Sequence, residues 1–377
     1  MSIPCLAENT GSKKFSGQQP YFNHEIYGCP TVVKAGHNGT VKMKQSSKTM
    51  RTINKPPERK ENKYFPISPL ILRTDSSSDF RVYLYHNDQY VLYTKERESF
   101  TPKLKNMLYE NGTERIFVPF EQKKEYDNYV NENFETILND AQIPIKERSR
   151  VFLDTSNNLI QEIFDNNLPS GVTKGYFEKV KKIVHDTLHF LSLKEAIENI
   201  GKLVSHDYKT YSHSVHVFTY TIALLHNHNF TDQEKKDVGI GALLHDIGKR
   251  KIAKRILNKP GRLDKDEWKI IKRHPVFGTS LCSNLSLSHL SLNCILFHHE
   301  KYDGSGYPTG LAERNIPFPV RYLTCCDVYD AITSDRPYAQ AENAFNALKI
   351  MRNHMHGSFD MNVYKELVTL LSNTGIA

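Results

Sequence analysis

Hydrophobic positions change their spacing once along the chain. Between Tyr64 and Glu121 they form short β-like runs at residues 80–85, 90–94 and 115–118, and His86-Asn87-Asp88 is the predicted turn between the first two. Residues 101–109 predict a short helix that ends at Asn111-Gly112. This part of the chain therefore predicts a small α+β domain over residues 64–140.

From about residue 126 onward, apolar residues recur at helical spacing. The predicted helices cover residues 152–164, 176–188, 193–203, 212–226, 232–244, 264–274, 288–299, 320–334 and 341–354. The predicted fold class is therefore mainly α, with a multi-helix bundle over about residues 145–375 and the small α+β domain as an N-terminal accessory.

Charge separates the start of the chain from the rest. The net charge is +8, and residues 1–64 alone hold eleven Lys or Arg against four acidic residues. Gly, Ser, Asn and Pro are scattered through this stretch with little apolar periodicity, so we predict a disordered basic tail over residues 1–63. It contains no motif typical of nucleic-acid readers, and nucleic acid is not an expected partner.

Two further features bear on location. The chain has no stretch of about 18 consecutive apolar residues and no apolar signal segment at its start, so we expect neither a membrane span nor export. The six cysteines form no CxxC pair, and Cys325 and Cys326 are adjacent. We interpret all six as reduced thiols in a cytoplasmic protein.

Histidines and aspartates gather where predicted helices begin or end. His245-Asp246 and His298-His299 each follow an apolar run, and Asp327 follows another. His213 opens a predicted helix, and His274 precedes Pro275 at the predicted end of one. Imidazole and carboxylate together are ligands for iron, manganese or zinc, and several helices would supply them to a site in the bundle core.

The spacing of these residues resembles one family. His245-Asp246, followed by HHEKYDGSGYP at residues 298–308, is similar to the HD-GYP family, a branch of the HD-domain phosphohydrolases. The resemblance covers about residues 195–370 and extends to the order of all the histidines and aspartates named above. It implies a helical HD-GYP phosphodiesterase domain over residues 141–377, with its core at 195–370.

The resemblance also implies a ligand set for two divalent metal ions, iron or manganese. Asp246 would bridge the two ions. The first ion would be held by His213, His245, Asp246 and Asp327, and the second by Asp246, His274, His298 and His299.

Other family positions point to substrate contacts. Lys249 matches a lysine that faces the scissile phosphate, and Arg336 matches an arginine that holds the dinucleotide phosphate. In the loop, Gly306 lets the backbone approach a ligand, Tyr307 offers a hydroxyl and a flat ring face, and Pro308 stiffens the exit.

Two positions depart from the family pattern. Some members bind a third metal through a glutamate where this chain has Lys209, so we predict two ions rather than three. Ala339 stands where members often carry a basic residue, which leaves the preferred dinucleotide less defined than the reaction.

The resemblance implies hydrolysis of cyclic di-GMP to pGpG, and to GMP after a second cut, by a metal-bridging hydroxide, with Asp246 and Lys249 as the catalytic residues. Two alternatives stay open: another cyclic dinucleotide is the substrate, or the protein is a signalling adaptor that binds without cutting. Residues 64–140 would be a regulatory or dimerisation domain, and the candidate partners are a second copy of the chain and signalling proteins at the GYP loop.

Overall fold

The N-terminal part of the structure is a small antiparallel sheet. The computed structural model describes residues 63–74, 76–110, 112–165, 171–204, 210–335 and 340–376. Its four strands lie in the order β1 (Tyr64–Ile67), β4 (Ile116–Pro119), β2 (Val82–His86) and β3 (Gln89–Thr94). β4 is central and buries all four of its residues, which explains its unbroken apolar sequence.

The hairpin between β2 and β3 closes where the sequence predicts it. His86 pairs with Gln89, and the two residues between them, Asn87 and Asp88, have φ values of 47° and 60°. Asn and Asp tolerate this left-handed conformation, which a two-residue hairpin turn requires. Helix α1 (Pro102–Glu110) follows, and Gly112 at φ 61° lies just beyond its end.

Two short helices join the sheet to the bundle. They are α2 (Lys123–Glu132) and α3 (Phe134–Asn139). Tyr126 of α2 packs against Phe65 and Phe80, with ring centroids 5.3 and 5.6 Å apart. Both helices also contact α4 (Ile145–Asp165), and one continuous apolar core runs from the sheet into the bundle.

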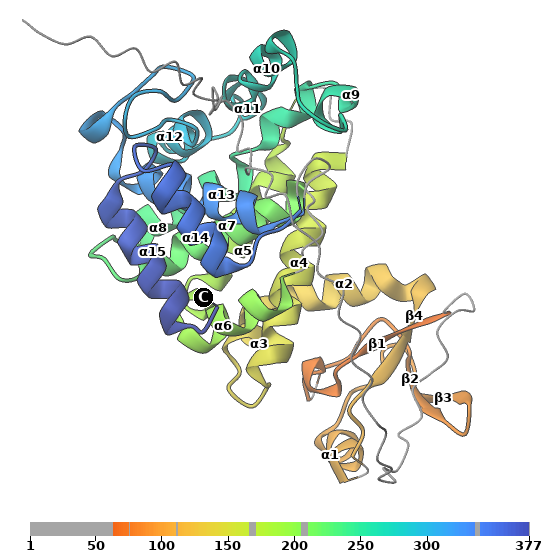
Figure 1. Ribbon diagram of the computed structural model, residues 1–377. Helices are drawn as coiled ribbons and strands as arrows, with labels where there is room; N and C mark the ends of the chain where they lie inside the picture. The colour runs from red at the N-terminus through yellow and green to blue at the C-terminus, as the bar shows by residue number, and fades with distance from the viewer. Residues whose placement is uncertain are drawn as a thin grey trace, which may run out of the picture.

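The remainder is a helical bundle, seen above and to the left of the sheet in Figure 1. Its further helices are α5 (Lys174–Thr187), α6 (Lys194–Leu203), α7 (Thr210–Leu225), α8 (Asp232–Leu244), α9 (Lys254–Leu257), α10 (Lys265–Ile271), α11 (His274–Leu281), α12 (His289–Phe297), α13 (Phe318–Thr333), α14 (Ala344–His354) and α15 (Met361–Asn373). None of the helices in the described ranges has the length and apolar character needed to cross a membrane.

Three helices form the centre of the bundle. Helix α7 packs against both α8 and α13. Helix α13 buries twelve of its sixteen residues, so the carboxylates that it carries lie inside the protein rather than on its surface. Helix α8 starts at a capping box between Thr231 and Glu234, which fixes where the helix begins.

The predicted fold class is confirmed: a mainly α bundle follows a small α+β part. Two details differ. Helix α15 was not among the predicted helices, although Val363, Leu367 and Leu371 recur at helical spacing and are buried. His274 begins α11 instead of ending the preceding helix, because α10 stops at Ile271. The basic tail, except Lys63, lies outside the described residues, and the boundary at 140/141 stays a prediction.

Candidate metal centre

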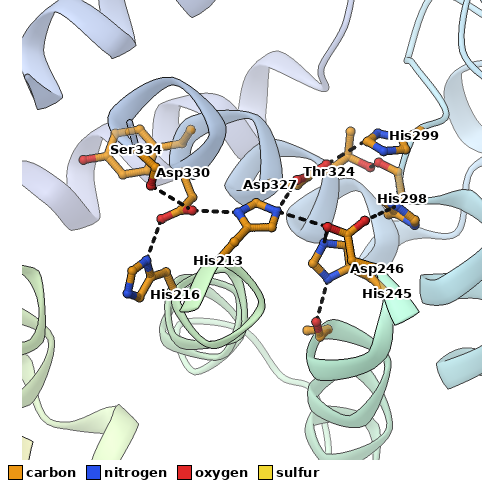
Figure 2. Close-up of polar contacts among 12 residues, drawn as sticks. His213, His216, His245, Asp246, His298, His299, Thr324, Asp327, Asp330 and Ser334 are labelled. Atoms are coloured by element: carbon orange, nitrogen blue, oxygen red, sulfur yellow. Dashed lines mark hydrogen bonds and ion pairs between the residues drawn. The ribbon is translucent and has the colours of Figure 1, made fainter. Parts of the chain in front are cut away.

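The predicted ligands converge from five helices. His213 lies in the first turn of α7, and His274 is the first residue of α11. Three further helices supply the remaining ligands. His245 and Asp246 directly follow α8, His298 and His299 directly follow α12, and Asp327 lies within α13. All of these side chains are buried, and Figure 2 shows most of them around Asp246.

A close backbone contact brings α8 and α11 together. After Asp246 the chain forms a short 3₁₀ helix, Ile247–Lys251, which packs on α11. A Cβ at Gly248 would lie 1.8 Å from the carbonyl oxygen of His274, so only glycine fits there. This approach sets Asp246 Oδ1 3.3 Å from His274 Nε2.

The ligand atoms form two overlapping groups that share one carboxylate. In each group the candidate atoms lie within 4.8 Å of one another: Asp246 with His274, His298 and His299, and Asp246 with His213 and His245. Asp327 lies beside both groups, 3.0 Å from His213 Nε2 and 3.5 Å from His299 Nδ1. The family resemblance assigns Asp327 to the first group, and in the structure its carboxylate also lies near His299 of the second.

The main chain fixes which ring nitrogen faces the cluster. Nδ1 of His245 lies 2.7 Å from Ala242 O, Nδ1 of His274 lies 2.8 Å from Ile271 O, and Nδ1 of His298 lies 3.0 Å from Ile295 O. A carbonyl oxygen can only accept, so each Nδ1 carries the proton. The three Nε2 atoms therefore turn bare lone pairs inward, which is the form that binds a metal.

Buried atoms without partners show that a cation fits here. The Nε2 atoms of His274 and His298 face each other at 3.0 Å, although neither carries a proton to donate. In the described residues, His245 Nε2, Asp246 Oδ1 and Asp327 Oδ2 are buried without a hydrogen-bond partner. Unpaired buried acceptors facing one another are costly unless a cation lies between them.

Electrostatics favour the same protonation states. Burial by itself would raise the pKa of Asp246, but Lys249 and the neighbouring histidines outweigh it and hold that pKa well below its usual range. Burial lowers the pKa values of His245, His298 and His299, and the neighbouring histidines add to this effect. These shifts favour an ionised Asp246 and neutral imidazoles at His245, His298 and His299, as metal binding requires.

Lys249 lies at the edge of this cluster. It follows Asp246 by three residues, and its Nζ donates to Asp246 Oδ2 at 2.5 Å. The lysine is only partly exposed, so its charge acts on the carboxylate with little screening. A cation in this position can also face an anionic group brought to the cluster.

A second buried carboxylate, absent from the predictions, supports His213. Asp330 lies one turn after Asp327 on α13 and is 1% exposed. Its two oxygens lie 2.7 Å from His213 Nδ1 and 3.0 Å from His216 Nδ1, as Figure 2 shows. Asp330 thereby turns His213 Nε2 toward the cluster, the usual task of a carboxylate behind a metal-bound histidine. The Asp-x-x-Asp spacing of 327 and 330 was the available signal.

Glu300 holds the glycine-rich loop against the ligand histidines. Its Oε1 accepts from Thr309 N and Oγ1, both at 2.7 Å, and from Gly310 N at 3.1 Å. Sequence reasoning gave Glu300 no role of its own. Since Glu300 directly follows His299, its hydrogen bonds to Thr309 and Gly310 hold the loop next to the ligand histidines.

The glycines of the loop serve different needs. Gly304 adopts a left-handed conformation with φ 78°, which glycine tolerates best. Gly306 has no positive φ, but a Cβ there would lie 2.3 Å from Lys301 N. Glycine is therefore required at this position because a side chain would clash, not because of its backbone conformation. The centroid of the Tyr307 ring lies 4.8 Å from that of the His299 ring, and Pro308 is the next residue in the chain. Arg336 lies outside the described residues, as do Lys209 and Ala339.

Known proteins share this domain. The model of the HD domain matches residues 182–363. The cyclic di-GMP phosphodiesterase PA4108 of Pseudomonas aeruginosa is 41% identical over 174 residues, which are 46% of this chain and 42% of that protein. The 3'3'-cGAMP-specific phosphodiesterase 3 of Vibrio cholerae is 34% identical over 163 residues, 43% of this chain and 35% of that protein. The chain spans less than half the length of these relatives.

A solved structure extends the likeness beyond the domain. Bd1817, an HDGYP protein from Bdellovibrio bacteriovorus, aligns with a TM-score of 0.58 at 22% identity and covers 82% of this chain and 99% of its own. At this identity it shows a shared fold. The bundle and its buried His/Asp cluster define an HD-domain protein. With the HHE-to-GYP loop beside that cluster, residues 182–363 form a domain of the HD-GYP family.

Proposed function

We propose that this protein hydrolyses a phosphodiester bond of a cyclic dinucleotide, with cyclic di-GMP as substrate and pGpG as first product. The observation that carries the proposal is the pair of ligand groups sharing Asp246, with a loop of the GYP type folded over them. Relatives described as cyclic di-GMP and cGAMP phosphodiesterases support the substrate class.

Two divalent ions fit the two groups, and we propose iron or manganese. Metal ions at such a site supply Lewis acidity and hydroxide at neutral pH. His213, His245, His274, His298 and His299 present neutral nitrogens to the ions. The carboxylates Asp246 and Asp327 balance their charge.

The remaining residues would bind and orient the substrate. Lys249 stands beside Asp246 and would face the scissile phosphate, where its charge favours the transition state over the ground state. Gly306, Tyr307 and Pro308 would border the dinucleotide, and Arg336 would hold its phosphate. The cytoplasmic location, the homodimer and signalling partners at the loop are proposals that rest on the sequence.

Replacement of Asp246 tests the proposal, because this carboxylate belongs to both ligand groups. Chelator-stripped protein is reloaded with Fe²⁺ or Mn²⁺ without oxygen, and products of cyclic di-GMP, 3'3'-cGAMP and cyclic di-AMP are separated by chromatography. We expect Asp246→Asn to lose turnover and bound metal together. Asp232→Asn, an exposed change in the first turn of α8, should keep both.

Each other outcome has a defined meaning. Turnover of a different cyclic dinucleotide alone would correct the substrate. Tight binding of cyclic di-GMP by fully metal-loaded protein, without cleavage of any of the three, would refute hydrolysis and favour an adaptor. Wild-type turnover by a metal-replete Asp246→Asn variant would refute the mechanism.

A further inference from the structure

A row of aromatic rings leads from the surface to the metal centre. The Tyr307 ring lies 4.8 Å from the ring of the ligand His299 on one side and 6.3 Å from the Trp268 ring on the other. Lys272 Nζ lies 5.5 Å from the centroids of both the Trp268 and Tyr307 rings. Trp268, Lys272 and Tyr307 are all half-buried, so each keeps some exposure to solvent.

Trp268 lies outside the hydrophobic core. Its helix, α10, contains no fully buried residue, and a capping box between Asp264 and Glu267 holds the first turn. The indole N–H makes no hydrogen bond within the described residues. A tryptophan that lies outside the core, with its ring next to Tyr307 and so close to a ligand histidine, is placed where it can contact a flat ligand.

The surroundings of Trp268 are strongly basic. Residues 249–273, which run from the end of α8 to the start of α11, contain eleven Lys or Arg and three acidic residues. Lys254, Arg255 and Lys269 are exposed. Figure 1 shows α9, α10 and α11 together at the end of the bundle farthest from the sheet. Such a surface attracts polyanions toward the site that it borders.

We propose that a purine base of the substrate stacks on Trp268, in a wall that Tyr307, edge-on at 79°, and Lys272 complete, while the basic segment draws in the phosphates. The inference rests on the proposed function and adds where a base is held. Stacking needs a planar face and tolerates changes of substituent, so the wall would grip purine dinucleotides without distinguishing strongly between guanine and adenine.

The chain carries its own probe, since Trp268 is its single tryptophan. Metal-loaded full-length protein is mixed with cyclic di-GMP in a stopped-flow fluorimeter, with pyrophosphate as a ligand that has charge but no base. We expect cyclic di-GMP to quench the fluorescence before product forms, and pyrophosphate to leave it nearly unchanged. Equal responses to both ligands, or turnover without any quench, would overturn the wall. Quenching without turnover would keep the wall and reject the hydrolytic function.

Variants separate base binding from a structural role. Trp268→Ala should raise KM for cyclic di-GMP about 5- to 100-fold, as expected for a lost stacking contact. The rate on bis(p-nitrophenyl) phosphate, which has no base, should change less than about two-fold, because the metal cluster is intact. Trp268→Phe should recover most of the affinity, and Ile270→Ala, a change of an exposed uncharged side chain on the same helix, should resemble wild type. An equal loss on both substrates, or a Phe variant as weak as the Ala variant, would contradict the proposal.

Discussion

Asp330 offers a sharp test of how the cluster is held together. Its carboxylate, inaccessible to water, accepts from His213 and His216, and only His213 belongs to a ligand group. In Asp330→Asn, the amide oxygen can still accept from His213 while the amide nitrogen donates to His216, which is free to change tautomer. In Asp330→Ala neither contact remains. Asp330→Asn therefore removes only the negative charge, whereas Asp330→Ala removes the hydrogen bonds as well.

The magnitude follows from the two kinds of hydrogen bond. A bond to a charged group contributes about 1.5–3 kcal/mol and a neutral one about 0.5–1.5 kcal/mol. The Asn variant should then lose about 1 kcal/mol of metal-binding free energy, or about 5-fold in Kd. The Ala variant should lose about 2 kcal/mol, or about 30-fold, within the usual 10- to 100-fold for partners of metal-bound histidines.

Calorimetric titration of stripped, folded protein with Mn²⁺ measures this order directly. Asp186→Asn is the matched control, a buried carboxylate on α5 whose partner is Lys182, and its Mn²⁺ affinity should equal wild type. If both Asp330 variants bound Mn²⁺ as tightly as wild type, Asp330 would not orient His213. If Asn were as weak as Ala, the charge rather than the geometry would account for the whole effect.

Three further outcomes are expected. Gly248→Ala should unfold at a temperature many degrees lower and bind less metal, because its Cβ would lie 1.8 Å from His274 O; an unchanged melting curve would contradict this packing. Removal of metal should lower Tm, and restored Mn²⁺ at about 100 times its Kd should return about 2.7 kcal/mol, visible by scanning calorimetry. Metal-free protein should lose stability as pH falls below about 6.5, because His245, His298 and His299 have lowered pKa values and the unfolded chain binds protons first; a pH-independent Tm between 7 and 5 would refute this.

The sequence predicted those elements whose conformation depends on residues close together in the chain. Asn87 and Asp88 indicated the hairpin because few residues adopt its turn conformation. Strand β1 pairs with β4, more than 45 residues later, and no local pattern records that pairing. The end of α10 was misjudged because apolar spacing continues through Ile270 and Ile271, whereas the chain turns before His274 to meet Gly248.

The candidate site divides in the same way. The His/Asp residues could be named from the sequence because most of them lie at predicted helix ends and because their order along the chain resembles that of the HD-GYP family. The position of Asp327 near His213 and His299, and the support of His213 by Asp330, depend on how α7 and α13 pack. Trp268 could not have been selected at all, since a lone aromatic residue in an amphipathic stretch is far more often a packing residue.

The ligand histidines differ in how easily a mutation can disturb their tautomers. The tautomers of His245, His274 and His298 are set by peptide carbonyls, which no substitution can delete. That of His213 depends on a side chain, which a single nucleotide change can remove. A lineage that gradually loses catalysis should therefore first lose Asp330 while it keeps the histidines. A descendant that has become inactive in this way would still carry the His-Asp and HHE-to-GYP motifs.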